Sequence, residues 1–386
     1  MNKKMTVLAV CTILVLILSG CHRADVSSSE KDSSGSDPQA EETEDDTRVK
    51  ERSIEPDVRE QEVNDCMETA GLYADLYTSA DKGTASNIIL DDETLHQIVN
   101  RLGEHGYSVS CSYFDCNLLN YEELDHTLNR AVRGEDVTAE YYTVLSNGGL
   151  SRCFLSFLDG TLTVINTRTD WTAANEPHLY YQQCYQAYQW NYTKKGWLIT
   201  EKAKSINQEM DMHSLVRVLP LSDQCRDFCR KYIAPIGYAG SDLFLTDWDD
   251  TSAAQLNLYR MFPYFYQMDS GLWPTAETFP AGIPEHIFEE MLTSHLPVSA
   301  EQLRTIPEYQ SETASYFWNP ASCDTKGLAF PPFPEVIEVS EHADGTFTLR
   351  VDAVSKENGT DCFFSHQITL RLKENGSAEY LGNKMS

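Results

Sequence analysis

Strict alternation of apolar and polar residues near the C-terminus constrains the fold of this chain more than any other feature. In the segment 346–353, "TFTLRVDA", one side carries Phe347, Leu349, Val351 and Ala353, and the other carries Thr348, Arg350 and Asp352. The segment 366–373, "HQITLRLK", repeats the pattern, and a tight turn is expected at Asn375 and Gly376. Because side chains alternate across a strand, both segments predict antiparallel strands with one dry face and one solvated face.

Helical spacing of apolar residues precedes the strand patterns in both halves of the chain. The first half predicts helices near 63–77, 92–103 and 121–132, then a hairpin turning at Asp159 and Gly160, and two more strands around 186–193 and 196–202. The second half predicts a helix beginning at Pro284, a capping box of Ser299 with Gln302, and further strands. This order predicts an α+β fold in which helices pack on curved antiparallel sheets.

The order of elements also resembles a known superfamily. A curved antiparallel sheet wrapped on two or three N-terminal helices is similar to the cone-shaped nuclear-transport-factor-2-like fold. The resemblance implies two related modules of cone type, because the halves echo each other; duplication of one module and chance reuse of turn residues both explain the echo. The superfamily contains enzymes and binding modules alike, so the resemblance does not choose a function.

The N-terminus has the features of an export signal. Lys3 and Lys4 precede an apolar stretch from 5 to 18 that is too short to span a bilayer comfortably. The residues that follow, "LSGC" at 18–21, resemble the lipobox of bacterial lipoproteins. The resemblance implies cleavage before Cys21, a diacylglyceryl group on its sulfur, and fatty acyl chains such as palmitate that anchor the chain to the membrane. An ordinary signal peptide and an uncleaved anchor are the alternatives.

Composition divides the rest of the chain. The residues after Cys21 are rich in Ser, Asp and Glu and lack apolar periodicity, so they cannot bury enough surface to offset the entropy of ordering. The predicted organisation is a signal peptide over 1–20, an acidic, Ser-rich disordered tether over 21–62, an N-terminal α+β domain over 63–215 and a C-terminal α+β domain over 216–386.

Charge and cysteine usage restrict the partners and the surroundings. The formal net charge of −29 excludes nucleic acid as a partner. Nine cysteines remain without Cys11 and Cys21, an odd number that argues against a fully disulfide-bonded domain and indicates a reducing habitat. Cys111 and Cys116 are the best candidates for a local disulfide, and the sequence leaves their oxidation state open.

No catalytic signature stands out, and the sequence predicts no cofactor, no catalytic residue and no metal site. The strongest candidate for a ligand site is a set of aromatic residues between 171 and 197. Four of these residues are the predicted ligand-binding residues: Trp171, Tyr181, Trp190 and Trp197. Such rings with nearby amides suit a sugar or peptide groove, although strand aromatics more often fill a core.

Most of the chain after the tether resembles an uncharacterised family of lipoproteins of Gram-positive gut clostridia, and the residues that carry the resemblance are 229–250 and the tail from 330 to 385. The resemblance implies a location and no activity. The sequence therefore predicts a lipid-anchored lipoprotein on the outer face of the cell membrane, a non-enzymatic module that binds a protein or carbohydrate. The alternatives are a glycan-active hydrolase at the cell surface and the solute-binding subunit of a transporter, which would need parallel strands.

Overall fold

The computed structural model describes residues 46, 48–84, 87–112, 116–204, 212–323 and 330–386. These residues form a mixture of helices and several sheets, without a closed barrel among them. The predicted α+β class is confirmed, whereas the cone arrangement and the domain boundary at 215 stay predictions. No helix in the described ranges has both the length and the apolar character that crossing a membrane requires.

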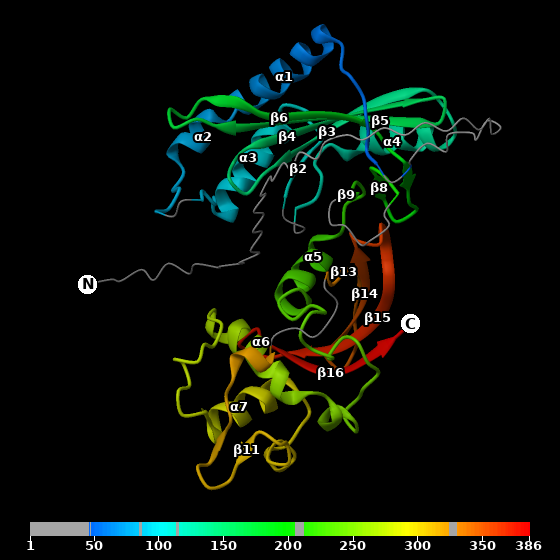
Figure 1. Ribbon diagram of the computed structural model, residues 1–386. Helices are drawn as coiled ribbons and strands as arrows, with labels where there is room; N and C mark the ends of the chain where they lie inside the picture. Colours follow the sequence, from blue (N-terminus) through cyan, green and yellow to red (C-terminus); the bar gives the residue numbers. More distant parts are fainter. Residues whose placement is uncertain (1–45, 47, 85–86, 113–115, 205–211, 324–329) are drawn as a thin grey trace, which may run out of the picture. The chain divides into compact units, whose positions relative to one another are not determined.

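The first half builds two sheets. Its elements are β1 (Lys50–Glu51), α1 (Pro56–Gly71), α2 (Ala74–Ser79), α3 (Asp92–Glu104), β2 (Val109–Cys111), α4 (Tyr121–Val132), β3 (Val137–Val144), β4 (Leu150–Leu158), β5 (Thr161–Trp171), β6 (Pro177–Gln186), β7 (Gln189–Tyr192), β8 (Trp197–Glu201) and β9 (His213–Arg217). The larger sheet has the order β1-β6-β5-β4-β3-β2 and is antiparallel except for the pair β2–β3 (Figure 1). The smaller sheet, β7-β8-β9, is antiparallel.

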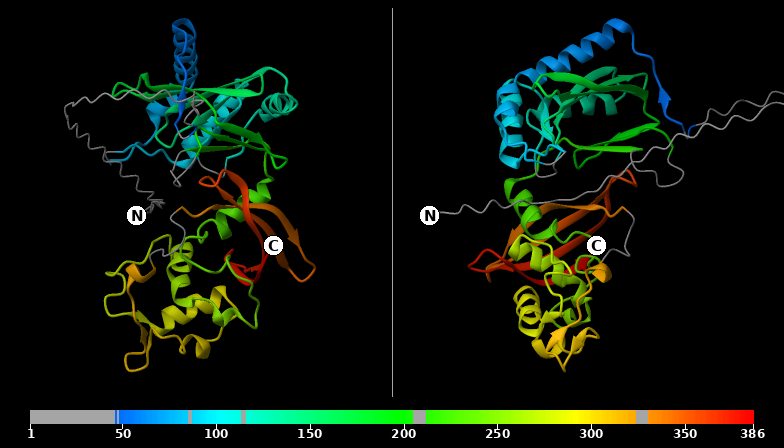
Figure 2. Two further views of the ribbon diagram at one scale, coloured as in Figure 1. Left: turned by 45° about the vertical axis from the view of Figure 1, so that its right-hand side comes forward. Right: turned by 60° about the vertical axis from the view of Figure 1, so that its left-hand side comes forward.

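The larger sheet is covered on both faces. Tyr142 packs in a core with residues of α1, α2 and α3, whereas its neighbour Tyr141 packs in another core with residues of α4, β7 and β8. Consecutive side chains of a strand point to opposite faces, so the two cores lie on opposite sides of the sheet. Figure 2 shows α1 running along one of these faces. The second face is the one that contains the pocket described below.

The N-terminal boundary corrects a prediction. α1 begins at Pro56, inside the segment 21–62 that the sequence assigns to a disordered tether. Glu62 belongs to this helix and is only 6 % exposed. β1 at Lys50–Glu51, which pairs with β6, lies in the same segment. The tether prediction is therefore wrong from Lys50 on, because the sequence of an acidic stretch does not show which of its residues have partners far along the chain. The helix predicted over 63–77 is also divided, into α1 and α2.

Several local predictions are confirmed by the backbone. The helix predicted near 92–103 is α3, although its N-cap is Asp91, whose carboxylate accepts from the Thr94 amide at 2.6 Å. Asp159 and Gly160 both have a positive φ between β4 and β5, as a tight hairpin requires. The predicted capping box is formed at the start of α8 (Ala300–Leu303) by Ser299 and Gln302.

The second half packs helices on a four-stranded antiparallel sheet. Its elements are α5 (Asp223–Phe228), a π-helical turn (Cys229–Ile233), a 3₁₀ turn (Ala253–Gln255), α6 (Leu258–Ser270), β10 (Ile283–Pro284), α7 (Glu285–His295), α8, β11 (Tyr309–Gln310), β12 (Ser315–Tyr316), a 3₁₀ turn (Pro320–Cys323), β13 (Phe333–Glu341), β14 (Thr346–Ser355), β15 (Thr360–Leu372) and β16 (Ala378–Met385). The order β13-β14-β15-β16 places Leu349 and Ile368 in one core with Phe262 of α6 and Phe288 of α7 (Figure 1).

One residue of β14 departs from the predicted solvated face. Arg350 is exposed as expected, but Asp352 is 2 % exposed. Its carboxylate accepts hydrogen bonds from Lys195 Nζ at 2.6 Å and from Ser365 Oγ at 2.8 Å. The prediction of a wet position is wrong here because long-range partners, which the alternation pattern does not record, satisfy the buried charge.

Candidate functional site

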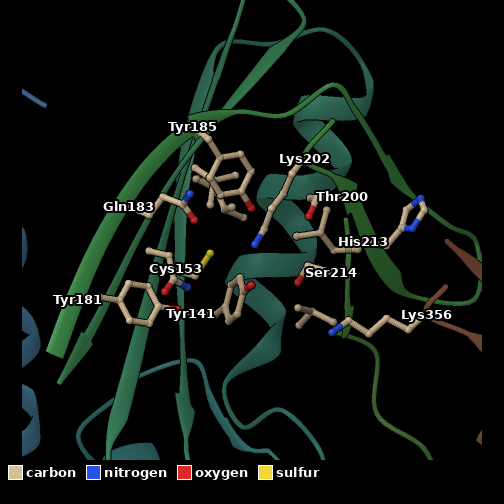
Figure 3. A pocket seen from close by; sticks show the side chains of 15 residues that line it. Tyr141, Cys153, Tyr181, Gln183, Tyr185, Thr200, Lys202, His213, Ser214 and Lys356 are labelled. Atoms are coloured by element: carbon tan, nitrogen blue, oxygen red, sulfur yellow. The ribbon is translucent and has the colours of Figure 1, made fainter. Parts of the chain in front are cut away.

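A pocket of about 360 Å³ lies in the first half, between the larger and the smaller sheet (Figure 3). Its lining comes from β3, β4, β5, β6, β8 and β9, with additions from the segment after β8 and from the turn between β14 and β15. The lining residues that Figure 3 labels are Tyr141, Cys153, Tyr181, Gln183, Tyr185, Thr200, Lys202, His213, Ser214 and Lys356. A cavity of this size suits a small organic molecule.

One wall of the pocket is a row of polar side chains across four neighbouring strands. Tyr141 lies directly opposite Cys153, Cys153 opposite Asn166, and Asn166 opposite Gln183. Direct opposition brings the Cβ atoms of each pair to about 5 Å, so the hydroxyl, thiol and amide groups form a continuous polar strip. The strip forms because the pairing of β3 with β4, of β4 with β5 and of β5 with β6 places one polar residue of each strand directly opposite a polar residue of the next strand.

Apolar residues lie beside the polar strip. Leu155 and Val164 are opposed to each other on β4 and β5, and each is at most 2 % exposed. On the facing wall, Leu198 is opposed to Val216, and the next facing pair is Thr200 with Ser214. The pocket therefore offers an apolar part and a hydroxyl-rich part to the same ligand.

The charged groups of the lining are cationic. Figure 3 shows the ammonium group of Lys202 directed between the rings of Tyr185 and Tyr141, and Lys202 Nζ lies 5.6 Å from the centre of the Tyr185 ring. Lys202 forms no salt bridge with any residue that the structure describes. The same view shows His213 pointing away from this group, and its Nε2 lies 3.7 Å from Glu201 Oε1. Within the part of the chain that the structure describes, the lining contains neither Asp nor Glu, although the chain has a net charge of −29.

Two side chains of the pocket that could lose a proton, Cys153 and Tyr141, stay protonated at neutral pH. Burial raises the pKa of the Cys153 thiol to about 11, so the sulfur is protonated at neutral pH. Burial also raises the pKa of Tyr141 well above its ordinary value, and hydrogen bonding with Cys153 adds to this shift. A protonated thiol and phenol are hydrogen-bond donors rather than nucleophiles. The arrangement is therefore suited to holding a ligand.

One polar atom of the lining has an unused hydrogen-bonding capacity. Asn166 Oδ1 is buried and accepts no hydrogen bond from the described residues, whereas the Nδ2 atom donates to Ser151 Oγ at 3.2 Å. A buried acceptor without a partner costs free energy, and native proteins keep such groups for a reason such as an absent ligand. Asn166 Oδ1 therefore has the capacity to accept a hydrogen bond inside the pocket.

Of the four aromatic residues predicted to bind a ligand, Tyr181 lines the pocket and is 42 % exposed. The three tryptophans lie elsewhere: Trp171 stacks on Tyr77 with ring centres 4.4 Å apart, Trp190 packs against Phe157 at 4.6 Å, and Trp197 is 2 % exposed and donates to Glu335 at 3.3 Å. The predicted lipidation site, Cys21, lies outside the described residues.

Sequence reasoning missed Tyr141, Asn166, Lys202 and Ser214. The alternation of Tyr181, Gln183 and Tyr185 along β6 is a signal that these three share one face. No local signal indicates which residues of other strands lie opposite them.

The fold and the site define a class: an α+β protein with a cationic, hydroxyl-lined pocket between two sheets. Within this class, the chain belongs to the family of unknown function DUF6070, whose model matches residues 59–386. No curated protein and no solved structure gives a significant match. The family match spans both halves of the chain and carries no activity with it.

Proposed function

We propose that this chain is a lipid-anchored lipoprotein on the outer face of the cell membrane, where it acts as a non-enzymatic binding module. The lipobox that ends at Cys21 supports the anchor, because the charged head, the apolar stretch and the cysteine occur in register. Two or more acyl chains would hold the protein durably at the membrane surface.

The ligand of this module is a small organic anion that also carries hydroxyl groups, as a sugar acid or a sugar phosphate does. The observation that carries this proposal is the lining of the pocket, where Lys202 is directed inward and none of the described lining residues is Asp or Glu. In a chain this acidic, a pocket whose described lining presents Lys202 and contains neither Asp nor Glu favours an anion by local charge. The unpartnered oxygen of Asn166 supports a hydroxyl on the same ligand.

The pocket favours binding over glycan hydrolysis. Canonical glycoside hydrolysis uses a pair of carboxylic acids beside the scissile bond, and the described lining contains neither Asp nor Glu. The thiol of Cys153 is held protonated by burial, so it offers no nucleophile at neutral pH.

Calorimetric titration of the full chain tests the ligand class. The probes are glucuronate, glucose 6-phosphate and uncharged glucose, which separate a carboxylate, a phosphate and a neutral sugar. We expect at least one anionic probe to bind and Lys202→Met to weaken it at least about tenfold, because the loss of a charge-assisted hydrogen bond costs about 1.5–3 kcal/mol.

Lys194→Met is the matched control, since Lys194 is exposed on the turn between β7 and β8. It should leave affinity unchanged. Preference for glucose over both anions, or equal affinity in Lys202→Met and wild type, would contradict the proposed ligand class.

The anchor has a separate test. Mass spectrometry of the mature protein from cells should find residue 21 as the first residue, with a diacylglyceryl group on its sulfur. Cys21→Ser should abolish labelling with palmitate and release the chain from the membrane fraction. Detection of an unmodified Cys21 in the mature chain would overturn the anchor and leave the pocket proposal untouched.

A further inference from the structure

Three metal-binding side chains meet in the first half, away from the pocket. They are His96 of α3, Cys111 at the end of β2, and Cys116 in the segment before α4. A ring nitrogen of the histidine and the two sulfurs all lie within 4.8 Å of one another. None of the three residues belongs to the lining of the pocket.

We propose that His96, Cys111 and Cys116 form a binding site for a thiophilic metal ion, and that this ion is Zn²⁺. Imidazole nitrogen and thiolate sulfur are the ligands that Zn²⁺ takes in proteins, and two cysteines with one histidine occur in known zinc sites. Three protein ligands leave the fourth tetrahedral position for water or for a small ligand.

Different parts of the fold hold the three ligand residues in position. Cys111 is fixed by the parallel pair β2–β3, in which it lies opposite Val144. α3 is held in the same core by Leu95, the residue before His96. The chain next to Cys116 is fixed by Asn117, which exchanges hydrogen bonds with the backbone of Leu221 at 2.9 and 3.1 Å.

The spacing needs only a small contraction to hold a metal ion. Bonds of about 2.3 Å to sulfur and 2.0 Å to nitrogen at tetrahedral angles require ligand atoms about 3.5–3.8 Å apart. His96 and Cys116 are half-buried, so their side chains have room to rotate, while Cys111 is 6 % exposed and lies at the base of the site. The separations between the ligand atoms, which are at most 4.8 Å, would shorten by about 1.3 Å or less.

The charge balance also suits a half-buried position. Zn²⁺ with two thiolates and one neutral imidazole carries no net charge. Removing this site from water therefore has no large desolvation cost. Binding converts two thiols to thiolates, and their two protons pass to the solvent. No oxidant or reductant takes part.

Zinc binding by the full chain, purified under anaerobic conditions and freed of excess metal, tests the site. We expect about one zinc ion per chain by elemental analysis, and loss of affinity by more than about 100-fold in Cys111→Ser and in Cys116→Ser. A direct ligand should matter more than the hydrogen-bond partner of a ligand, whose loss costs roughly 10- to 100-fold. Co²⁺ in place of Zn²⁺ should give the intense visible bands of a tetrahedral site with sulfur ligands.

Two control variants keep the test specific. Cys362→Ser removes a half-buried thiol on β15, and His105→Gln removes an exposed histidine next to the end of α3. Both should retain the zinc ion, while His96→Gln should weaken it. Circular dichroism of each metal-free variant verifies folding.

The proposal is overturned if wild type binds no zinc. It is also overturned if the controls lose as much as the ligand variants, or if the protein isolated from cells contains a Cys111–Cys116 disulfide. Since neither proposal depends on the other, failure here leaves the pocket and the anchor unaffected.

Discussion

The guanidinium group of Arg152 on β4 donates a hydrogen bond to the carboxylate of Glu62 on α1, and the two side chains are 6 and 7 % exposed. Arg152 Nε also donates to the Tyr142 hydroxyl at 2.9 Å, and its second amino group donates to Glu140 at 2.5 Å. This network connects the first helix to the face of the sheet opposite the pocket.

Replacement of Glu62 by alanine should destabilise the protein by about 3 kcal/mol, because it removes a principal partner of a buried cation. Urea denaturation measures the change in the free energy of unfolding. Glu60→Ala is the control, since Glu60 is exposed on the same helix and should change stability by less than about 0.5 kcal/mol. Equal losses in the two variants would show that the buried pair contributes nothing of its own.

A second buried network should make stability depend on pH. His366 is fully buried, and its Nδ1 lies 2.6 Å from Asn383 Oδ1 while its Nε2 lies 3.0 Å from the Tyr238 hydroxyl. Because Asn383 Nδ2 donates to Thr246, Asn383 Oδ1 faces the histidine as an acceptor, so Nδ1 carries the proton and Nε2 accepts from Tyr238. Burial lowers the pKa of His366 to about 4.

The direction of the pH dependence follows from the difference in proton uptake between the unfolded and the folded chain. Between pH 6.5 and 4 the unfolded chain binds a proton at His366 that the folded chain does not, so the free energy of unfolding falls as the pH decreases through this range. The contribution is about 3 kcal/mol, fully present above pH 6.5. Urea denaturation at several pH values should show a smaller pH dependence in His366→Gln than in wild type. His105→Gln, which changes an exposed histidine, should retain the wild-type slope.

Local features of this fold were predictable from the sequence, and features that depend on distant partners were not. The hairpin at Asp159 and Gly160 and the capping box of Ser299 with Gln302 depend on neighbouring residues, and both are confirmed. α6 was missed because it contains Pro263, and proline inside a helical segment normally breaks the helix. The start of α1 was missed because the partner of Glu62 lies 90 residues away in the sequence.

The residues of the candidate site also divide into one that local sequence revealed and others that depend on distant partners. Tyr181 was found because aromatic residues stand out in any sequence, and it does line the pocket. Tyr141, Cys153 and Asn166 were missed because only the register of three strand pairs places them in one row. Considered one at a time, these residue types give no indication of a binding site.

Two glycines in turns provide a matched pair for testing packing against backbone strain. Gly148 has φ +80°, and a Cβ there would lie 2.7 Å from the ring of Tyr77 and 2.8 Å from Leu90. Gly160 has φ +74° and no atom within 4 Å of such a Cβ. Gly160→Ala should therefore cost about 1 kcal/mol from strain alone, and Gly148→Ala about 3 kcal/mol, as strain and overpacking add. Thermal and urea denaturation should rank them in this order, and the reverse order would refute the role of the close contact.

The last prediction separates the aromatic residues by role. Trp171 stacks on Tyr77, and its indole nitrogen donates to the Gly148 carbonyl at 2.7 Å, so Trp171→Ala removes both a ring contact and a hydrogen bond. It should lower the free energy of unfolding by about 3 kcal/mol and leave ligand affinity unchanged in the fraction that is folded.

Tyr181→Ala should do the opposite, because its ring is 42 % exposed and borders the pocket. We expect a loss of stability below about 1 kcal/mol and a measurable loss of affinity for the anionic probe. Denaturation and calorimetry on the same two variants provide both readouts. If Trp171→Ala impaired binding at full folding while Tyr181→Ala did not, the ligand would lie along the tryptophan rather than in the pocket.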